Sequence, residues 1–144
     1  MITSRQEYGV MLLRYAMAAV FLLFGINQLY APTGWTGFVP GWVSGLMSAS
    51  TAVIVNGCFE IIFGLFLLLG LYVRLSSLLL GLHLIGISFS LGHSSLAIRD
   101  LGLAMATLAL FLMGTDKYCL DVKRTATKSR QGRAENQEET KNEE

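Results

Sequence analysis

Four apolar stretches dominate this sequence, and each is about as long as the hydrocarbon core of a bilayer is thick. They run approximately over residues 9–29, 51–73, 75–91 and 97–113. Because a helix rises about 1.5 Å per residue, roughly 20 residues span a core of about 30 Å. With 53% hydrophobic and 15% charged residues, the chain is too apolar for a soluble domain of this size. The sequence therefore predicts an all-α fold: a four-helix transmembrane bundle, over residues 1–121, in contact with lipid.

A signal peptide is the competing interpretation of the first stretch. Arg14 interrupts its apolar run, however, and no convincing small-residue cleavage motif follows. We therefore expect this stretch to remain as a helix of the mature protein.

The connections between the stretches differ in length and composition. Those on either side of the third stretch are short, which makes neighbouring helices antiparallel. The first connection, residues 30–50, is uncharged and is interrupted by Pro32 and Pro40. It also contains Trp35 and Trp42, and indole rings prefer the headgroup level of a membrane. We expect an interfacial loop between the first two helices, with a lid over a ligand site as the alternative.

Charge is concentrated outside the apolar stretches and predicts the orientation of the chain. Seven of the eleven Lys and Arg residues lie beyond Gly114. With four spans, both termini face the side that also holds Arg5 and Arg74, whereas Arg99 stands alone on the other side. By the positive-inside rule, the termini should be cytoplasmic in a plasma or inner cell membrane. Residues 122–144 have almost no apolar side chains to bury, which predicts a disordered, charged cytoplasmic tail.

Glu60 is a carboxylate in the middle of the second apolar stretch. An ionised group at that depth is costly unless it is paired or hydrated, so it needs a partner, a proton or a ligand. Asn56 and Gly64 lie one turn away on the same helix face. Two interpretations stay open: a structural ion pair with Arg14 or Arg99, or membership of a ligand or proton site.

Other polar residues in the stretches are candidates for the same site. His83 is expected near the depth of Glu60, and Arg14 shares a face of the first helix with Gln28. Each has a structural alternative: a core histidine bonded to a carbonyl for His83, and snorkelling to the interface for Arg14. Arg99 could face lipid phosphates, and Asp100 could simply favour a helix start. The candidate proton or ligand site comprises Glu60, His83, Asn56, Arg99, Asp100 and Arg14.

No motif for a bound cofactor is present in the sequence. His83 and His93 lie ten residues apart and suit neither a haem nor a metal centre, so no metal is expected. Cys58 and Cys119 do not form a C-x-x-C pair and are expected to be free. Glycine-rich nucleotide loops are absent, and we expect no nucleic-acid partner. Electrons, if they are transferred, must therefore be carried by a quinone or a partner subunit.

The order of several short motifs resembles the DoxX family of small four-helix membrane proteins. The resemblance covers residues 7–121 and is carried by Arg14, "FG" at 24–25, Glu60 with Gly64, "LLGL" before Arg74, "RDLGL" at 99–103 and "GTDKYCLD" at 114–121. It implies a bundle in the cell membrane. For some relatives it implies the small subunit of a thiosulfate:quinone oxidoreductase, or a partner of membrane-linked redox-defence proteins. Two departures stand out: Asn27 and Gln28 replace a frequent Lys, and "GTD" replaces "GPG".

Three functions from different classes follow. The first is a subunit of a quinone-linked membrane oxidoreductase. In it Glu60, His83 and the outer polar groups Asn56, Arg99 and Asp100 bind a headgroup and relay its protons. The second is a non-enzymatic scaffold whose ion pairs fix helix register. The third is a small-solute carrier, which four short helices without repeats make less favourable unless the chain forms a homo-oligomer. The first ranks highest on the resemblance, with a redox subunit as its expected partner.

Overall fold

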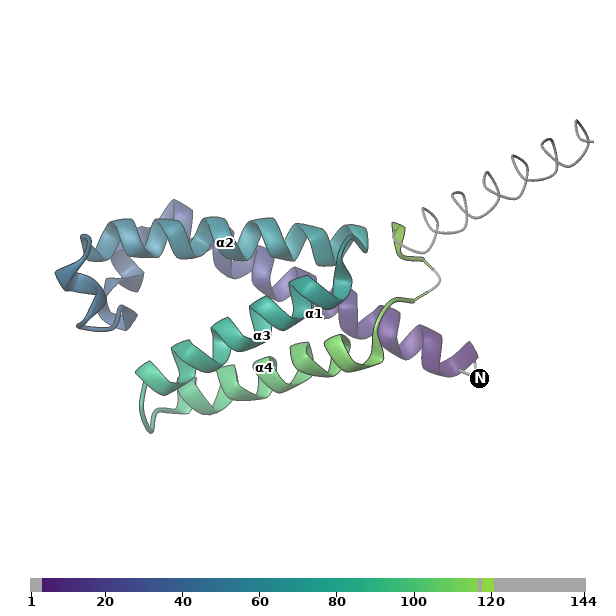
Figure 1. Ribbon diagram of the computed structural model, residues 1–144. Coiled ribbons are helices and arrows are strands. Elements are labelled where there is room, and N and C mark those ends of the chain that lie inside the picture. Colours follow the sequence, from purple (N-terminus) through teal and green to yellow (C-terminus); the bar gives the residue numbers. More distant parts are fainter. Residues whose placement is uncertain (1–3, 117, 121–144) are drawn as a thin grey trace, which may run out of the picture.

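The computed structural model describes residues 4–116 and 118–120 and is helical over nearly all of them (Figure 1). Four long helices follow in order: α1 (Ser4–Tyr30), α2 (Ala49–Leu69), α3 (Val73–Ser90) and α4 (Ser95–Met113). Each is long and apolar enough to cross a membrane. The predicted all-α, four-helix transmembrane fold is confirmed. The predicted tail at 122–144 lies outside the described residues.

The helix ends follow local backbone chemistry and differ by a few residues from the apolar stretches. α1 begins at Ser4, within a polar segment that precedes the first stretch. α2 ends at Leu69 because Gly70 adopts the left-handed conformation, with φ of 69°, and closes the helix. Ser48 and Ser94 begin α2 and α4 by accepting a hydrogen bond from the backbone N–H three residues later.

The helices form two antiparallel pairs. α1 packs most extensively against α2, and α3 against α4, while the contacts between the pairs are fewer. The start of α1, the α2–α3 turn and the end of α4 lie at one end of the bundle (Figure 1), here called the terminal side. Residues 31–48 and the α3–α4 turn lie at the other end, here called the loop side.

Two glycines allow α1 and α2 to approach closely. A Cβ atom at Gly25 would lie 2.8 Å from the carbonyl oxygen of Gly57, and one at Gly57 would lie 2.9 Å from that of Gly25. No other residue type fits such a backbone contact without displacing a helix. The contact brings the polar side chains that follow Gly25 within reach of those on α2.

Large apolar side chains cover much of the outside of the bundle. Among the most exposed are Leu12, Leu23, Phe89, Ile98 and Leu112, each at least 69% accessible. In water such a surface would be an aggregation hazard. It is the surface expected of helices solvated by lipid, so the chain is a membrane protein in contact with a bilayer.

The connection between α1 and α2 contains two short 3₁₀ helices, η1 (Pro32–Phe38) and η2 (Val43–Gly45). The indole N–H of Trp35 donates to Oδ1 of Asn27 at 2.9 Å, and its ring meets Phe24 edge-on at 5.7 Å. Trp42, in contrast, is 72% exposed. Trp35 therefore anchors η1 to α1, while Trp42 projects outward, as the predicted interfacial loop requires.

Candidate functional site

A triangle of polar side chains joins α1 and α2 in the loop-side half of the bundle. Nε2 of Gln28 donates to Oε2 of Glu60 at 3.0 Å. Nδ2 of Asn56 donates to Oε1 of Glu60 at 3.0 Å and to Oε1 of Gln28 at 2.8 Å. Asn56 and Glu60 share one face of α2 because they are four residues apart. Glu60, only 3% exposed, is thus held by two neutral amides.

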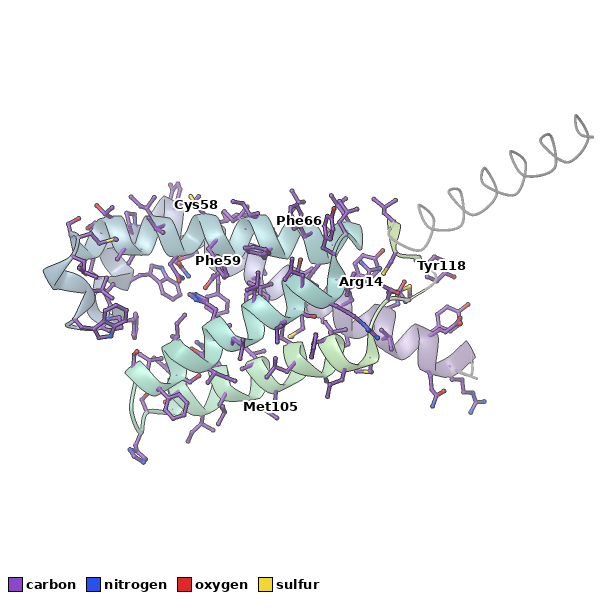
Figure 2. All side chains as sticks on the ribbon, in the orientation of Figure 1. Arg14, Cys58, Phe59, Phe66, Met105 and Tyr118 are labelled. Atoms are coloured by element: carbon purple, nitrogen blue, oxygen red, sulfur yellow. The ribbon has the colours of Figure 1, made fainter. Side chains whose placement is uncertain are left out.

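His83 brings a third helix to this site. Its Nε2 lies 4.0 Å from Oε1 of Glu60, and that nitrogen is buried without a hydrogen-bond partner. The ring of Phe59 packs against the imidazole, with centroids 4.8 Å apart. Figure 2 shows Phe59 on the side of α2 that faces α3, and Cys58 on the opposite side. The arrangement is a carboxyl group facing a histidine nitrogen that has unused hydrogen-bonding capacity.

Arg99 and Asp100 on α4 pair with each other. Nε and Nη2 of Arg99 both lie 2.8 Å from Oδ1 of Asp100. The guanidinium also sits 5.3 Å from the centre of the Phe24 ring on α1. The structure therefore places Arg99 against α1, one helical turn from Gln28, and its ion-pair partner is Asp100 and not Glu60.

The structure places Arg14 apart from Glu60, in a cluster at the terminal side (Figure 2). Its Nε donates to Oδ2 of Asp116 at 2.8 Å. Its Nη1 donates to the carbonyl oxygens of Leu67 and Leu68, at 2.7 and 2.9 Å. Arg14 is 1% exposed, so it does not snorkel to the interface. Gln28, the α1 residue that contacts Glu60, lies about 21 Å further along the helix.

The arginine cluster also positions the chain after α4. Oδ1 of Asp116 accepts a hydrogen bond from the backbone N–H of Tyr118 at 2.8 Å. Cys119 is fully buried against Gly70, where an added Cβ would lie 2.6 Å from Cys119 Cα. Burial raises the pKa of the Cys119 thiol, an effect that the nearby Arg14 opposes. Both cysteines are free, and the cluster ties α1, the end of α2 and the segment after α4 together.

Sequence reasoning missed two residues, Gln28 and Asp116. Gln28 was available from the pattern, because it shares a face of α1 with Arg14, and glutamine in a bilayer seeks a polar partner. Asp116 follows the fourth stretch by three residues and is the nearest acid on the side of Arg14. Its contact with Arg14 depends on how the chain turns after Met113, which no helical periodicity encodes.

A comparison with known families identifies the fold independently. The family model of DoxX matches residues 9–94, which is more than half of the chain. The match includes Gln28, Asn56, Glu60 and His83, whereas Arg99, Asp100 and Asp116 lie beyond it. Comparisons with curated proteins and with solved structures gave no match. By its sequence and its four apolar helices, this chain is a multi-pass membrane protein that belongs to the DoxX family.

Proposed function

We propose that this protein is the membrane subunit of a quinone-linked oxidoreductase complex, in which Glu60 and His83 contact the quinone headgroup. One observation carries the proposal: the buried carboxyl of Glu60 is hydrogen-bonded by neutral amides and faces the unpartnered Nε2 of His83. Within the described residues, the contacts of Glu60 include no Lys or Arg. A carboxyl group in this situation suits proton exchange better than a structural ion pair.

The residues present fit a quinone headgroup. When bound, a quinone accepts two electrons and two protons and becomes a quinol. Nε2 of His83 and Oε1 of Glu60 are near enough to contact one headgroup oxygen together. Phe59 offers an aromatic wall beside His83, and Gln28 and Asn56 fix the carboxyl in place. In this proposal a partner subunit supplies the electrons, and this chain binds the headgroup and handles its protons.

The proposal also includes the orientation. Arg5 and Arg74 lie at the starts of α1 and α3, which are on the terminal side, whereas Arg99 lies near the start of α4, which is on the loop side. This bias supports a cell-membrane protein with a cytoplasmic terminal side. A cysteine introduced at Gly34, on η1, would react with a membrane-impermeant maleimide in intact cells if the orientation is correct. A cysteine at Gln6 would not react until the cells are opened.

Co-purification tests the function. The protein is purified in mild detergent, and accompanying subunits and quinones are identified by mass spectrometry, for wild type and for Glu60→Gln. We expect quinone and a redox subunit with the wild type, and a folded Glu60→Gln protein that retains the subunit but loses quinone. The proposal fails if the wild type carries no redox-active partner and does not bind added quinone in detergent.

A non-enzymatic scaffold is the second candidate, and one observation favours it. The Gln28–Asn56–Glu60 triangle cross-links α1 and α2, and hydrogen bonds of this kind hold membrane helices together. If the protein is a scaffold, Glu60→Gln should weaken the α1–α2 contact and, together with it, the association with partner proteins. Retained assembly with lost quinone distinguishes the first candidate from the second.

A further inference from the structure

A row of aromatic side chains lies along α2 and begins beside His83. Phe59, Phe63 and Phe66 share one face of this helix because they are four and three residues apart. The ring centroids of Phe59 and Phe63 are 4.7 Å apart, and those of Phe63 and Phe66 are 5.9 Å apart. The ring of Tyr72, in the α2–α3 turn, follows at 6.4 Å from that of Phe66. These four side chains are here called the aromatic row.

One end of the aromatic row belongs to the proposed headgroup site. The Phe59 ring packs against the His83 imidazole with centroids 4.8 Å apart, and Nε2 of His83 lies 4.0 Å from Oε1 of Glu60. From Phe59 the row extends along α2 toward the terminal side, over about 10 Å as far as Phe66. The row is therefore a continuous apolar extension of a site whose own groups are polar.

The aromatic row lies at the edge of the bundle and not in its core. Phe59 and Phe63 are only partly buried where they pack against the core, and Phe66 is half-buried as well. Tyr72 is 59% exposed, and the His83 side chain is 27% exposed although its Nε2 is buried. The contacts between α2 and α3 are also fewer than those within each antiparallel pair. The row and the imidazole are therefore accessible along the seam between α2 and α3.

We propose that the aromatic row holds the isoprenoid tail of a membrane quinone whose headgroup lies at Glu60 and His83. Such a quinone is a polar ring joined to a long unsaturated chain, so its site needs a polar part and an apolar extension. The row supplies this extension where the polar part ends, and its flat rings offer the chain a large contact area. The tail then runs along the α2–α3 seam toward the terminal side. The tail site deepens the proposed function and rests on it for the identity of the headgroup.

The competing explanation is packing alone, in which the rings join α2 to α3 and bind no ligand. Packing makes no distinction between quinones with tails of different length, whereas a tail site does. An extended isoprene unit is about as long as one helical turn. Successive units of the tail should therefore reach Phe59, Phe63 and Phe66 in that order.

Quinones with the same headgroup and tails of different length test this order. The protein in detergent is titrated calorimetrically with ubiquinone analogues that carry from zero to four isoprene units. Phe63→Ala should weaken binding several-fold from two units upward, and Phe66→Ala only from three units upward. Neither should change binding of the tail-less analogue, whereas Glu60→Gln should weaken binding of every analogue. Partitioning of the longer analogues into micelles cancels, because each variant is compared with the wild type at the same tail length.

Phe89→Ala is the matched control, because Phe89 is 83% exposed and lies outside the aromatic row. It should leave the affinity for every analogue unchanged. Helix content and elution volume in detergent show whether each variant is folded. Phe63→Leu, which keeps an apolar side chain but not the flat ring, takes the place of Phe63→Ala if the latter does not fold. The dependence of wild-type affinity on tail length needs no variant.

A prenyl chain without a quinone headgroup separates the tail site from the proposed function. A farnesol analogue with a photoreactive diazirine on its chain is cross-linked to the protein in liposomes, and mass spectrometry locates the adduct. We expect the adduct on the peptide containing residues 59–66, and several-fold less of it in Phe63→Ala. Phe89→Ala should leave the yield unchanged. This measurement does not depend on quinone binding.

Three outcomes would overturn the tail site. The first is a wild-type affinity, or an effect of folded Phe63→Ala, that is the same with and without a tail. The second is an order of tail lengths in which Phe66→Ala acts before Phe63→Ala. The third is cross-linking of the farnesol analogue away from residues 59–66. If no quinone binds but the farnesol analogue labels the row, the headgroup assignment fails and the prenyl site remains.

Discussion

The two halves of the bundle bury a carboxylate in opposite ways. On the terminal side, Asp116 is paired with Arg14, and the guanidinium also satisfies two carbonyl oxygens at the end of α2. On the loop side, Glu60 has neutral amides as donors and a histidine nitrogen without a partner. The first arrangement pairs opposite charges and holds segments together, although Nη2 of Arg14 is buried without a hydrogen-bond partner. The second arrangement places a carboxyl group without a counter-cation opposite a histidine nitrogen that can still bond a proton or a ligand, which is why we propose the functional role for Glu60 and the structural role for Asp116.

The largest expected effect comes from breaking the Arg14–Asp116 ion pair. Asp116→Ala leaves the Arg14 guanidinium buried without its counter-ion, which should destabilise the fold by about 3–5 kcal/mol. Unfolding in mixed detergent micelles, followed by circular dichroism, measures the loss. Removing both charges with Arg14→Met and Asp116→Ala should restore part of it. If the single variant unfolds like the wild type, the pair does not hold the terminal side together.

A smaller loss is expected where α1 and α2 touch. Gly57→Ala places a methyl group 2.9 Å from a backbone oxygen of Gly25, and overpacking of this kind costs about 1–3 kcal/mol. The helices must separate, so the Gln28–Glu60 hydrogen bond should weaken as well. The matched control is Gly86→Ala on α3, where an added Cβ has no atom within 4 Å. Equal stability of the two variants would contradict the close approach.

Neutralising Glu60 should cost much less than breaking the arginine pair. Glu60→Gln keeps a side chain of the same shape. Because no Lys or Arg among the described residues is paired with Glu60, the substitution leaves no buried cation without its counter-ion. We expect a change in unfolding free energy within about 1 kcal/mol. The same unfolding assay gives the value, with Asp116→Asn as the matched amide substitution. A loss as large as that of Asp116→Asn would mean that Glu60 is structural, and would remove the distinction between the two halves.

The smallest effect concerns the chemistry of Cys119. Because burial raises the pKa of its thiol, a smaller fraction is thiolate at any given pH than for an ordinary cysteine, and access is blocked as well. In a Cys58→Ser protein, iodoacetamide at pH 8 should therefore modify Cys119 several-fold more slowly in the folded state than in dodecyl sulfate, where the protein is unfolded. Gly70→Ala, which displaces Cys119, should raise the folded rate. Equal folded and unfolded rates would show that the segment after α4 is not docked.

The fold was predictable because length and hydropathy alone define four membrane helices. The common depth of Glu60 and His83 also follows from helical rise, and the structure brings them to 4.0 Å. The partners of the charged residues were not predictable in this way. For Arg14 the sequence left three possibilities open: an ion pair with Glu60, snorkelling to the interface, or membership of the candidate site. Its partner in the structure is Asp116, which an irregular turn after Met113 brings into contact with it. Periodicity describes positions along a helix, whereas ion pairing depends on tilt and on loop geometry.

The contact between Arg14 and Asp116 also has a consequence for biosynthesis. The two residues are 102 positions apart, and chains emerge from the ribosome beginning with the amino terminus. Arg14 is therefore translated well before its counter-ion, and also before the carbonyl groups of Leu67 and Leu68 that it bonds in the finished fold. A product truncated before residue 116 keeps an unneutralised arginine in the lipid. The pair can therefore form only in molecules whose translation has passed residue 116.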